Sequence, residues 1–159
     1  GEIIAYIDAD CRISPNWVEK ILAEFKQEAR LVCLSGPCAY YDLPRWQQIL
    51  VNLYWRLARL PYRLVGYMMI AGNFAIRREV LEKMNGFDTS IAFYGDDTDL
   101  ARRASRFGQV KFKPDFIIHT SGRRLARQGI INTGLTYGLN FFSQVLARRS
   151  ATKNYLDIR

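Results

Sequence analysis

The pattern of apolar and polar positions divides the first part of the chain into strand, helix and strand. Residues 2–7 are a short apolar run rich in β-branched side chains, which predicts a buried strand. Ser14-Pro15 is a helix-start signal, and apolar residues recur at helical spacing from there to about Glu28. Leu31 to Ser35 form a second apolar run, and Gly36-Pro37 is expected to end that strand.

The middle of the chain is predicted to contain a strongly apolar helix. It starts at Pro44 and closes at Pro61, and it is apolar around much of its circumference. Such a helix is either deeply buried or lies against another apolar surface, such as a lipid interface. Residues 65–76 then predict a strand with a turn or bulge at Gly72-Asn73, and a short helix is expected over residues 78–84.

An acidic helix and two short strands are predicted next. Asp96 and Thr98 can begin a helix, because a short side chain bearing an oxygen accepts a hydrogen bond from a free backbone N–H. Gly108 is a suitable residue to end that helix. The apolar residues at 110–112 and 116–119 predict the two strands.

The last part of the chain holds a long uncharged segment. A helix is expected from Ser121 to Arg127, and residues 129–147 then carry no charge. Their length permits a membrane span, but their Gly, Asn and Gln residues weigh against one. An interfacial helix flanked by Arg127 and Arg148-Arg149 fits better, and a buried core helix is the alternative.

Strands that alternate with helices predict an α/β fold, a sheet with helices on its faces. The 159 residues are enough for one domain with a core, and a hydrophobic fraction of 49% is ordinary for a globular protein. The formal charge of +8 suits an anionic partner, and its spread along the chain argues against a basic disordered tail. Three cysteines without metal-ligand spacing indicate free thiols in a reducing compartment. The apolar start, without an initiator Met, suggests a piece of a larger protein.

Two groups of acidic residues carry the candidate chemistry. Asp8 and Asp10 follow the first predicted strand, and in α/β sheets ligands bind beyond the carboxyl ends of strands. Two carboxylates spaced in this way suit Mg²⁺ or Mn²⁺, which also bind phosphate oxygens. Asp96, Asp97 and Asp99 form the second group in a basic chain. Together with many arginines, the groups indicate a metal-bound phosphate leaving group and a separate carboxylate for proton transfer.

Four blocks of the sequence resemble family 2 glycosyltransferases of the GT-A fold. Their order and spacing match the family, and they cover most of residues 1–128; they read YIDADCRISPNWVEKIL, IAGNFAIRREVLEKMNGFD, FYGDDTDLARRASRFGQVKF and HTSGRRL. The resemblance implies a mixed sheet flanked by helices. It also implies a partial catalytic domain over residues 1–128, followed by a helical segment over 129–159 that can lie at a membrane interface. The family's nucleotide-binding half would lie upstream of residue 1 and is missing here, which would leave the strand at 2–7 as an open edge.

The resemblance also implies roles for the acidic residues. Asp10 would be the main ligand of a divalent metal, Mg²⁺ or Mn²⁺, and Asp8 would contact the nucleotide or the metal through water. Asp97 matches the base that deprotonates the acceptor hydroxyl. Asp96 stands where the family usually has Glu, and this shorter side chain would face the acceptor. Gly72-Asn73 matches a turn that lines the pocket of the donor sugar.

Basic and imidazole side chains complete the implied site. Arg123 and Arg124 match a basic block of the family and can contact the diphosphate, although a solvated helix face or lipid headgroups are alternatives. His119, the only histidine, matches a late metal ligand of some GT-A enzymes, and a structural role is the alternative.

The function implied is inverting transfer of a hexose-type sugar from a nucleotide-diphospho-sugar to an acceptor hydroxyl. The acceptor would be a glycan or a lipid-linked molecule, as in the synthesis of cell-envelope polysaccharide. The protein would be cytoplasmic, peripheral on the cytoplasmic face of the membrane, and would not bind nucleic acid.

Two other functions remain open from the residues. A phosphatase of the haloacid-dehalogenase type also has an apolar strand ending in D-x-D, with Asp8 as nucleophile. Arg12 and the tight spacing of the acids after Gly95 argue against it. A non-catalytic basic module that binds a membrane surface or nucleic acid is permitted by the charge, but no aromatic–basic recognition motif is visible.

Overall fold

The computed structural model describes residues 1–91 and 94–152, so the end of the predicted 129–159 segment, residues 153–159, lies outside the described residues. Strands and helices follow one another along the chain in the order β1 (Ile3–Ile7), α1 (Trp17–Gln27), β2 (Leu31–Ser35), β3 (Cys38–Tyr40), α2 (Arg45–Leu57), α3 (Arg59–Val65), β4 (Asn73–Arg77), α4 (Arg78–Lys83), α5 (Asp96–Ala104), β5 (Gln109–Phe112), β6 (Ile118–Thr120), α6 (Arg123–Gln128) and α7 (Ile130–Ala147).

A mixed four-stranded sheet forms the centre of the fold, as predicted. Its strand order is β1-β4-β2-β5, in which β4 is antiparallel to both of its neighbours and β2 is parallel to β5. Among the described residues β1 pairs only with β4, so it is an edge strand, as expected for residues 2–7. The short strands β3 and β6 form a separate parallel pair that extends from the sheet.

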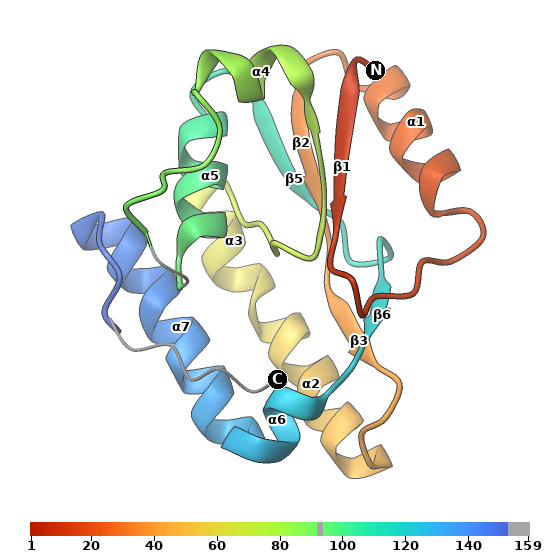
Figure 1. The fold of residues 1–159 in the computed structure, drawn as a ribbon, viewed down its shortest axis with the longest axis vertical. Helices are drawn as coiled ribbons and strands as arrows, with labels where there is room; N and C mark the ends of the chain where they lie inside the picture. The colour runs from red at the N-terminus through yellow and green to blue at the C-terminus, as the bar shows by residue number, and fades with distance from the viewer. Residues whose placement is uncertain (92–93, 153–159) are drawn as a thin grey trace.

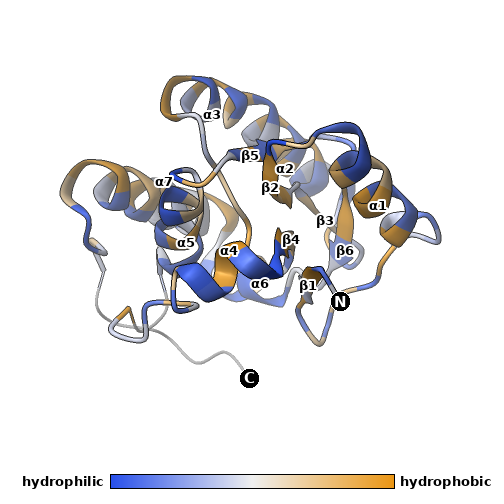
Figure 2. Ribbon diagram, turned by 90° about the horizontal axis from the view of Figure 1, so that it is seen from above, coloured by the Kyte–Doolittle hydropathy of each residue, from blue (hydrophilic) through white to orange (hydrophobic). Residues whose placement is uncertain are grey.

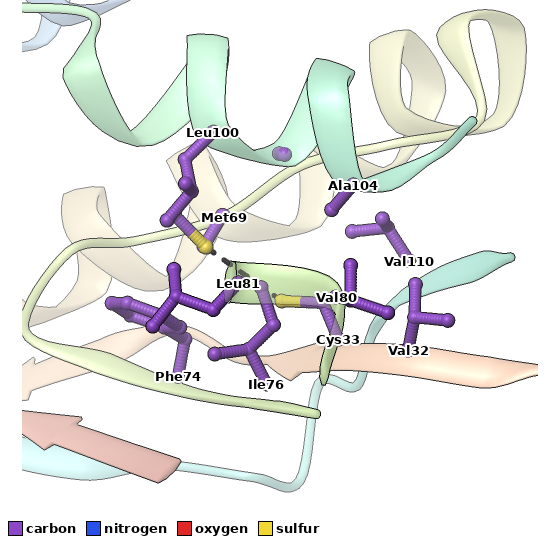
Figure 3. Packing of buried hydrophobic residues seen from close by; sticks show 11 residues of the cluster. Val32, Cys33, Met69, Phe74, Ile76, Val80, Leu81, Leu100, Ala104 and Val110 are labelled. Carbon is purple, nitrogen blue, oxygen red and sulfur yellow. Dashed lines mark hydrogen bonds between the residues drawn. The ribbon is translucent and has the colours of Figure 1, made fainter. Parts of the chain in front are cut away.

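Each face of the sheet is covered by its own hydrophobic core. On one face, α1 packs Trp17, Ile21 and Phe25 against the strands, and the ring of Trp17 stacks on Phe116. On the other face, α4 and α5 cover the side chains of β2 and β4, as Figure 3 shows for Leu100 of α5 above Phe74 and Ile76. Side chains of β4 alternate between the two cores, with Phe74 and Ile76 in one and Ala75 in the other. Strand β2, which is irregular between Leu31 and Cys33, also contributes to both.

A second group of helices packs beside this sheet. Helix α2 packs against β3 and leads into α3, and α7 packs against both α5 and α6 (Figure 1). Pro61 does not end the apolar helix, contrary to the prediction from its position. It lies in the first turn of α3, where a missing N–H removes no helical hydrogen bond, and only Ala58 separates α2 from α3.

Two further predictions about the elements need correction. Residues 65–72 are not part of a strand, because α3 extends to Val65 and Gly66 ends it in a left-handed conformation with φ 83°. The strand β3 was not expected after Gly36-Pro37, and it exists because Cys38 to Tyr40 pair with β6. The other predicted helices and strands are present within a few residues of their expected bounds.

Helix α7 has an unusual distribution of polar and apolar side chains. The side facing the protein buries polar residues, namely Thr133, Asn140 and Gln144. The exposed side is apolar and consists of Ile131, Leu135, Leu139, Phe142 and Leu146. Hydrophobic positions are visible in orange on both α3 and α7 in Figure 2. Within residues 1–91 and 94–152, no helix has the length and hydrophobicity needed to cross a bilayer.

Candidate active site

Asp8 and Asp10 line the same cavity as Asp96 and Asp97, although the two pairs are almost ninety residues apart in sequence. The cavity has a volume of about 760 Å³. Asp8 and Asp10 enter it from the turn after β1, and Asp96 and Asp97 enter it from the first turn of α5. The fold therefore brings residues of both acidic groups to one site.

The turn after β1 holds its two aspartates at the exposed mouth of the cavity. The backbone N–H of Cys11 donates to the carbonyl of Asp8 at 3.0 Å and closes the turn. The Asp10 carboxylate accepts a hydrogen bond from Thr120 Oγ1 at 3.3 Å, and Arg123 Nη2 lies 3.4 Å from its other oxygen. The pKa of Asp8 is raised by desolvation and by the charge of Asp10, and Arg124 opposes this shift.

Three side chains at this turn can hold a divalent cation together. A carboxylate oxygen of Asp8, one of Asp10 and the sulfur of Cys11 all lie within 4.8 Å of one another, which is compatible with ligation of a single ion. Cys11 could not be singled out from the sequence, because a single cysteine beside a D-x-D pair has no recognisable ligand spacing.

The structure does not bring His119 to this group. His119 lies on β6, is exposed, and exchanges backbone hydrogen bonds of 2.7 and 3.0 Å with Arg12. Within the described residues, its side chain neither lines the cavity nor joins the cluster of possible metal ligands. The structural alternative that the sequence left open agrees better with this position.

Gly72 and Asn73 have different positions relative to the cavity. Gly72 lines it, and a Cβ atom at this position would stand 2.4 Å from Oδ2 of Asp8, so only glycine allows this close approach. Asn73 is the first residue of β4 and is fully buried. Its amide donates to the carbonyls of Phe116 at 2.7 Å and Pro37 at 3.3 Å, and its oxygen accepts from Trp17 Nε1 at 3.1 Å. Asn73 thus holds the sheet together and does not reach the cavity.

The first turn of α5 presents Asp96 and Asp97 to the cavity. Gly95 precedes the helix with φ 92°, and the side chain of Gln144 from α7 fills the space that a Cβ of Gly95 would need. The Asp97 carboxylate accepts the backbone N–H of Thr98 at 2.6 Å. Asp96 does not cap the helix as predicted. Gly95 occupies the N-cap position, so no side chain caps the first turn of α5.

Burial changes the acid–base properties of both residues. It raises the pKa of Asp97 to about 7, and the neighbouring charge of Asp96 adds to this, while Thr98 and the Ala71 backbone oppose it. The pKa of Asp96 is also raised, by desolvation and by the charge of Asp8. A carboxyl group with a pKa near neutrality can accept and release a proton under physiological conditions.

The third acid of this cluster has a structural position. Asp99 is buried and accepts charge-assisted hydrogen bonds from Arg102 and from Arg103 Nε, the latter at 2.6 Å. Arg103 also donates to the carbonyls of Met84 at 3.0 Å and Gly86 at 2.8 Å. These bonds connect α5 to the turn after α4, and so they fix the orientation of the first turn of α5, where Asp97 lies.

Basic and aromatic side chains form the rest of the wall. Arg123 and Arg124 from α6 line the cavity. The positive charge of Arg124 acts to lower the pKa of both Asp8 and Tyr137. Burial raises the pKa of Tyr137 to about 12, and it also raises the pKa of Tyr54, which the charge of Asp97 raises further. Tyr137 was not expected at the site, because nothing in the uncharged segment distinguishes this tyrosine from a packing residue.

The first half of the chain matches a known protein family. The family model described as "Glycosyl transferase family 2" matches residues 1–85, which is just over half of the chain. No curated protein matches the chain significantly.

Solved structures resemble the fold at low sequence identity. One is the mannosyltransferase PcManGT from Pyrobaculum calidifontis in complex with GDP-Man and Mn²⁺, with 17% identity and a TM-score of 0.58; the match covers 93% of this chain and 39% of that one. Another is a mycobacterial protein with 17% identity and a TM-score of 0.45, of which 47% is covered. The chain therefore spans less than half the length of either structure.

Proposed function

The chain belongs to glycosyl transferase family 2, and from this premise we propose that it transfers a hexose-type sugar from a nucleotide-diphospho-sugar to an acceptor hydroxyl, with inversion at the anomeric carbon. One observation carries the proposal: Asp8 and Asp10 share a single cavity with Asp96 and Asp97. A cation site and a proton acceptor on one cavity are the two elements that this reaction needs.

The proposed metal is Mg²⁺ or Mn²⁺, held by Asp10 and Asp8. The closeness of their carboxylate oxygens supports this, as does the Mn²⁺ of the Pyrobaculum mannosyltransferase complex. When bound, such an ion stabilises negative charge on phosphate oxygens. Gly72 contributes by leaving room for Asp8, and Arg123 and Arg124 add positive charge on the same cavity.

Asp97 is the proposed base. The acceptor oxygen attacks the anomeric carbon and forms the new glycosidic bond, while the bond from that carbon to the diphosphate breaks and its electron pair leaves with the diphosphate. The acceptor proton moves to the Asp97 carboxylate, whose pKa of about 7 suits this transfer. Asp96, beside it in the cavity, would orient the acceptor hydroxyl, and its charge helps to keep the pKa of Asp97 high.

The proposal extends to a membrane surface and to an acceptor that is a glycan or lipid-linked. Its support is the apolar exposed side of α7 and the exposed leucines of α2 and α3. No acidic residue occurs between Asp42 and Glu79, whereas six arginines do, which favours anionic headgroups. Free Cys11, Cys33 and Cys38 agree with a reducing compartment, so we propose the cytoplasmic face of the membrane and a role in cell-envelope polysaccharide.

A transfer assay with matched variants tests the proposal. The full-length protein is incubated with GDP-mannose and other nucleotide sugars in the presence of Mn²⁺, and both transfer and donor binding are measured. We expect Asp97→Asn to lose at least about a thousandfold in transfer and to keep Mn²⁺-dependent donor binding. Asp10→Ala should lose both. Substantial turnover by Asp97→Asn would remove Asp97 from the role of base.

A further inference from the structure

A second, smaller cavity opens beside the candidate active site. It has a volume of about 280 Å³ and lies between α2 and α7, with parts of β3 and α6 at its base. We call it the apolar groove. Its walls carry no charged side chain, and they consist of Tyr40, Leu50, Val51, Tyr54, Trp55, Leu125, Ile130, Ile131, Gly134, Leu135 and Tyr137.

The apolar groove adjoins the active-site cavity. Five residues line both of them, namely Tyr40, Tyr54, Trp55, Leu125 and Tyr137. Trp55 is fixed in this shared wall, because its indole N–H donates to the carbonyl of Cys38 at 2.9 Å and its ring meets Tyr54 edge to face. The aromatic wall therefore presents rigid apolar surface to the groove and lies next to the acids on the other side.

The far end of the groove reaches the exposed apolar surface. Leu50 is 40% exposed, Ile131 is 70% exposed and Leu135 is 68% exposed, so a long molecule can enter from outside. Arginines surround the groove: α2 carries Arg45 and Arg56, and Arg148 and Arg149 follow directly after α7, which is itself uncharged. The chain has no acidic residue between Asp42 and Glu79 and none between Asp115 and Asp157, and arginines occur in both stretches. An apolar channel within a basic surface is complementary to an anionic molecule with a hydrocarbon tail.

We propose that the apolar groove binds the hydrocarbon chain of a phosphate-bearing lipid whose attached hydroxyl is the sugar acceptor. This inference rests on the proposed function and makes it more specific, since it selects a lipid-linked acceptor over a free glycan. The hydrocarbon chain of the lipid would lie between α2 and α7, and the shared aromatic wall would direct the hydroxyl end of the lipid towards Asp96 and Asp97. The bonds formed and broken are those of the proposed transfer.

Gly134 gives a means to close the groove. It lies on α7, and a Cβ at this position would meet only the ring of Tyr54, at an ordinary 3.9 Å. Gly134→Ala therefore fits without strain, whereas Gly134→Leu extends into the groove. Both changes suit a helix better than glycine does, so unfolding is not the expected effect. Leu146→Asn is the matched control, because Leu146 is on the same helix, 82% exposed, and outside the groove.

The test measures how binding depends on chain length. The full-length protein is titrated by calorimetry with butyl, octyl and dodecyl phosphate, each below its micelle concentration. Affinity should rise by about fourfold for each methylene group that enters the groove. Gly134→Ala and Leu146→Asn should keep this dependence, and Gly134→Leu should bind dodecyl phosphate no better than butyl phosphate. Equal affinity of the wild-type protein for all three probes, or an unchanged dependence in Gly134→Leu, overturns the proposal.

A separate titration distinguishes failure of the groove from failure of the proposed function. GDP-mannose is added to the wild-type protein with and without Mn²⁺. If donor binding depends on Mn²⁺ but alkyl phosphate binding does not depend on chain length, the proposed transferase function is kept and the proposed lipid site is refuted. A free glycan would then be the acceptor. If the affinity for alkyl phosphates depends on chain length but no nucleotide sugar is bound or used, the proposed transferase function is refuted and an apolar lipid site remains.

Discussion

Replacement of Asp97 by Asn should make the protein inactive and, above neutral pH, more stable. The side chain is almost isosteric, and Asn retains an oxygen that can accept the Thr98 N–H, now 2.6 Å from the carboxylate. The difference between the two side chains is the charge. Burial and the neighbouring Asp96 disfavour that charge, and they raise the pKa of Asp97 from the ordinary 3.8 to about 7.

The size and sign of the effect follow from the two pKa values. The folded protein binds the Asp97 proton more tightly than the unfolded chain does, so the group stabilises the fold only when protonated. Above pH 7 it is ionised in both states. Because its pKa is about 7 in the folded protein and ordinarily 3.8, its charge then destabilises the fold by up to about 4 kcal/mol. As the pH falls from 7 towards 3.8, the folded state takes up its proton and this penalty disappears.

Urea unfolding at pH 8 and pH 5 measures this directly. Asp97→Asn should raise the free energy of unfolding by about 2–4 kcal/mol at pH 8 and by no more than about 2 kcal/mol, and less than at pH 8, at pH 5. Asp99→Asn is the control on the same helix, and it should destabilise the protein by about 1–3 kcal/mol because Arg102 and Arg103 lose their carboxylate. The hypothesis that desolvation raises the pKa of Asp97 is refuted if Asp97→Asn is no more stable than wild type at pH 8. It is also refuted if the gain in free energy of unfolding is not smaller at pH 5.

Three further outcomes are expected from the same site and its support. The rate of sugar transfer should rise with pH through about 7 and then level off, because Asp97 must be ionised to accept a proton; a flat profile from pH 5 to 9 would contradict this. Gly72→Ala should weaken Mn²⁺ affinity, measured by calorimetry, by roughly tenfold or more, because the new methyl group displaces Asp8, and unchanged affinity would argue against that contact. Asn73→Ala should lower the free energy of unfolding by about 2–4 kcal/mol in urea, since three buried partners lose their hydrogen bonds; a loss below about 0.5 kcal/mol would contradict this structural role.

Hydrophobic patterning predicted most of the fold because buried elements impose it directly. All five residues of β2 are buried, and its predicted bounds, Leu31 to Ser35, agree with the structure. Patterning failed where an element depends on a distant partner or on the position of a single residue. Strand β3 has only three residues and exists through β6, and Pro61 is tolerated because it falls in the first turn of α3.

The site was predictable in its acids and not in the direction of every side chain. Motif spacing identified Asp10 and Asp97, which do share a cavity. It could not tell that Gly72 faces that cavity while the next residue, Asn73, turns into the core, because neighbouring residues at a strand end point in opposite directions. For α7, the choice between an interfacial and a buried helix was undecidable from composition, since the helix buries its polar side and exposes its apolar one.

The claim on which the whole account depends is that both acidic groups act on one bound donor. Crystals of the full-length protein soaked with GDP-mannose and Mn²⁺ test it through the anomalous signal of manganese. We predict a manganese peak between Asp8 and Asp10, with the sugar extending across the cavity so that its anomeric carbon faces Asp97. Manganese bound at Asp96 and Asp97, or a sugar that lies outside the cavity, would contradict the account.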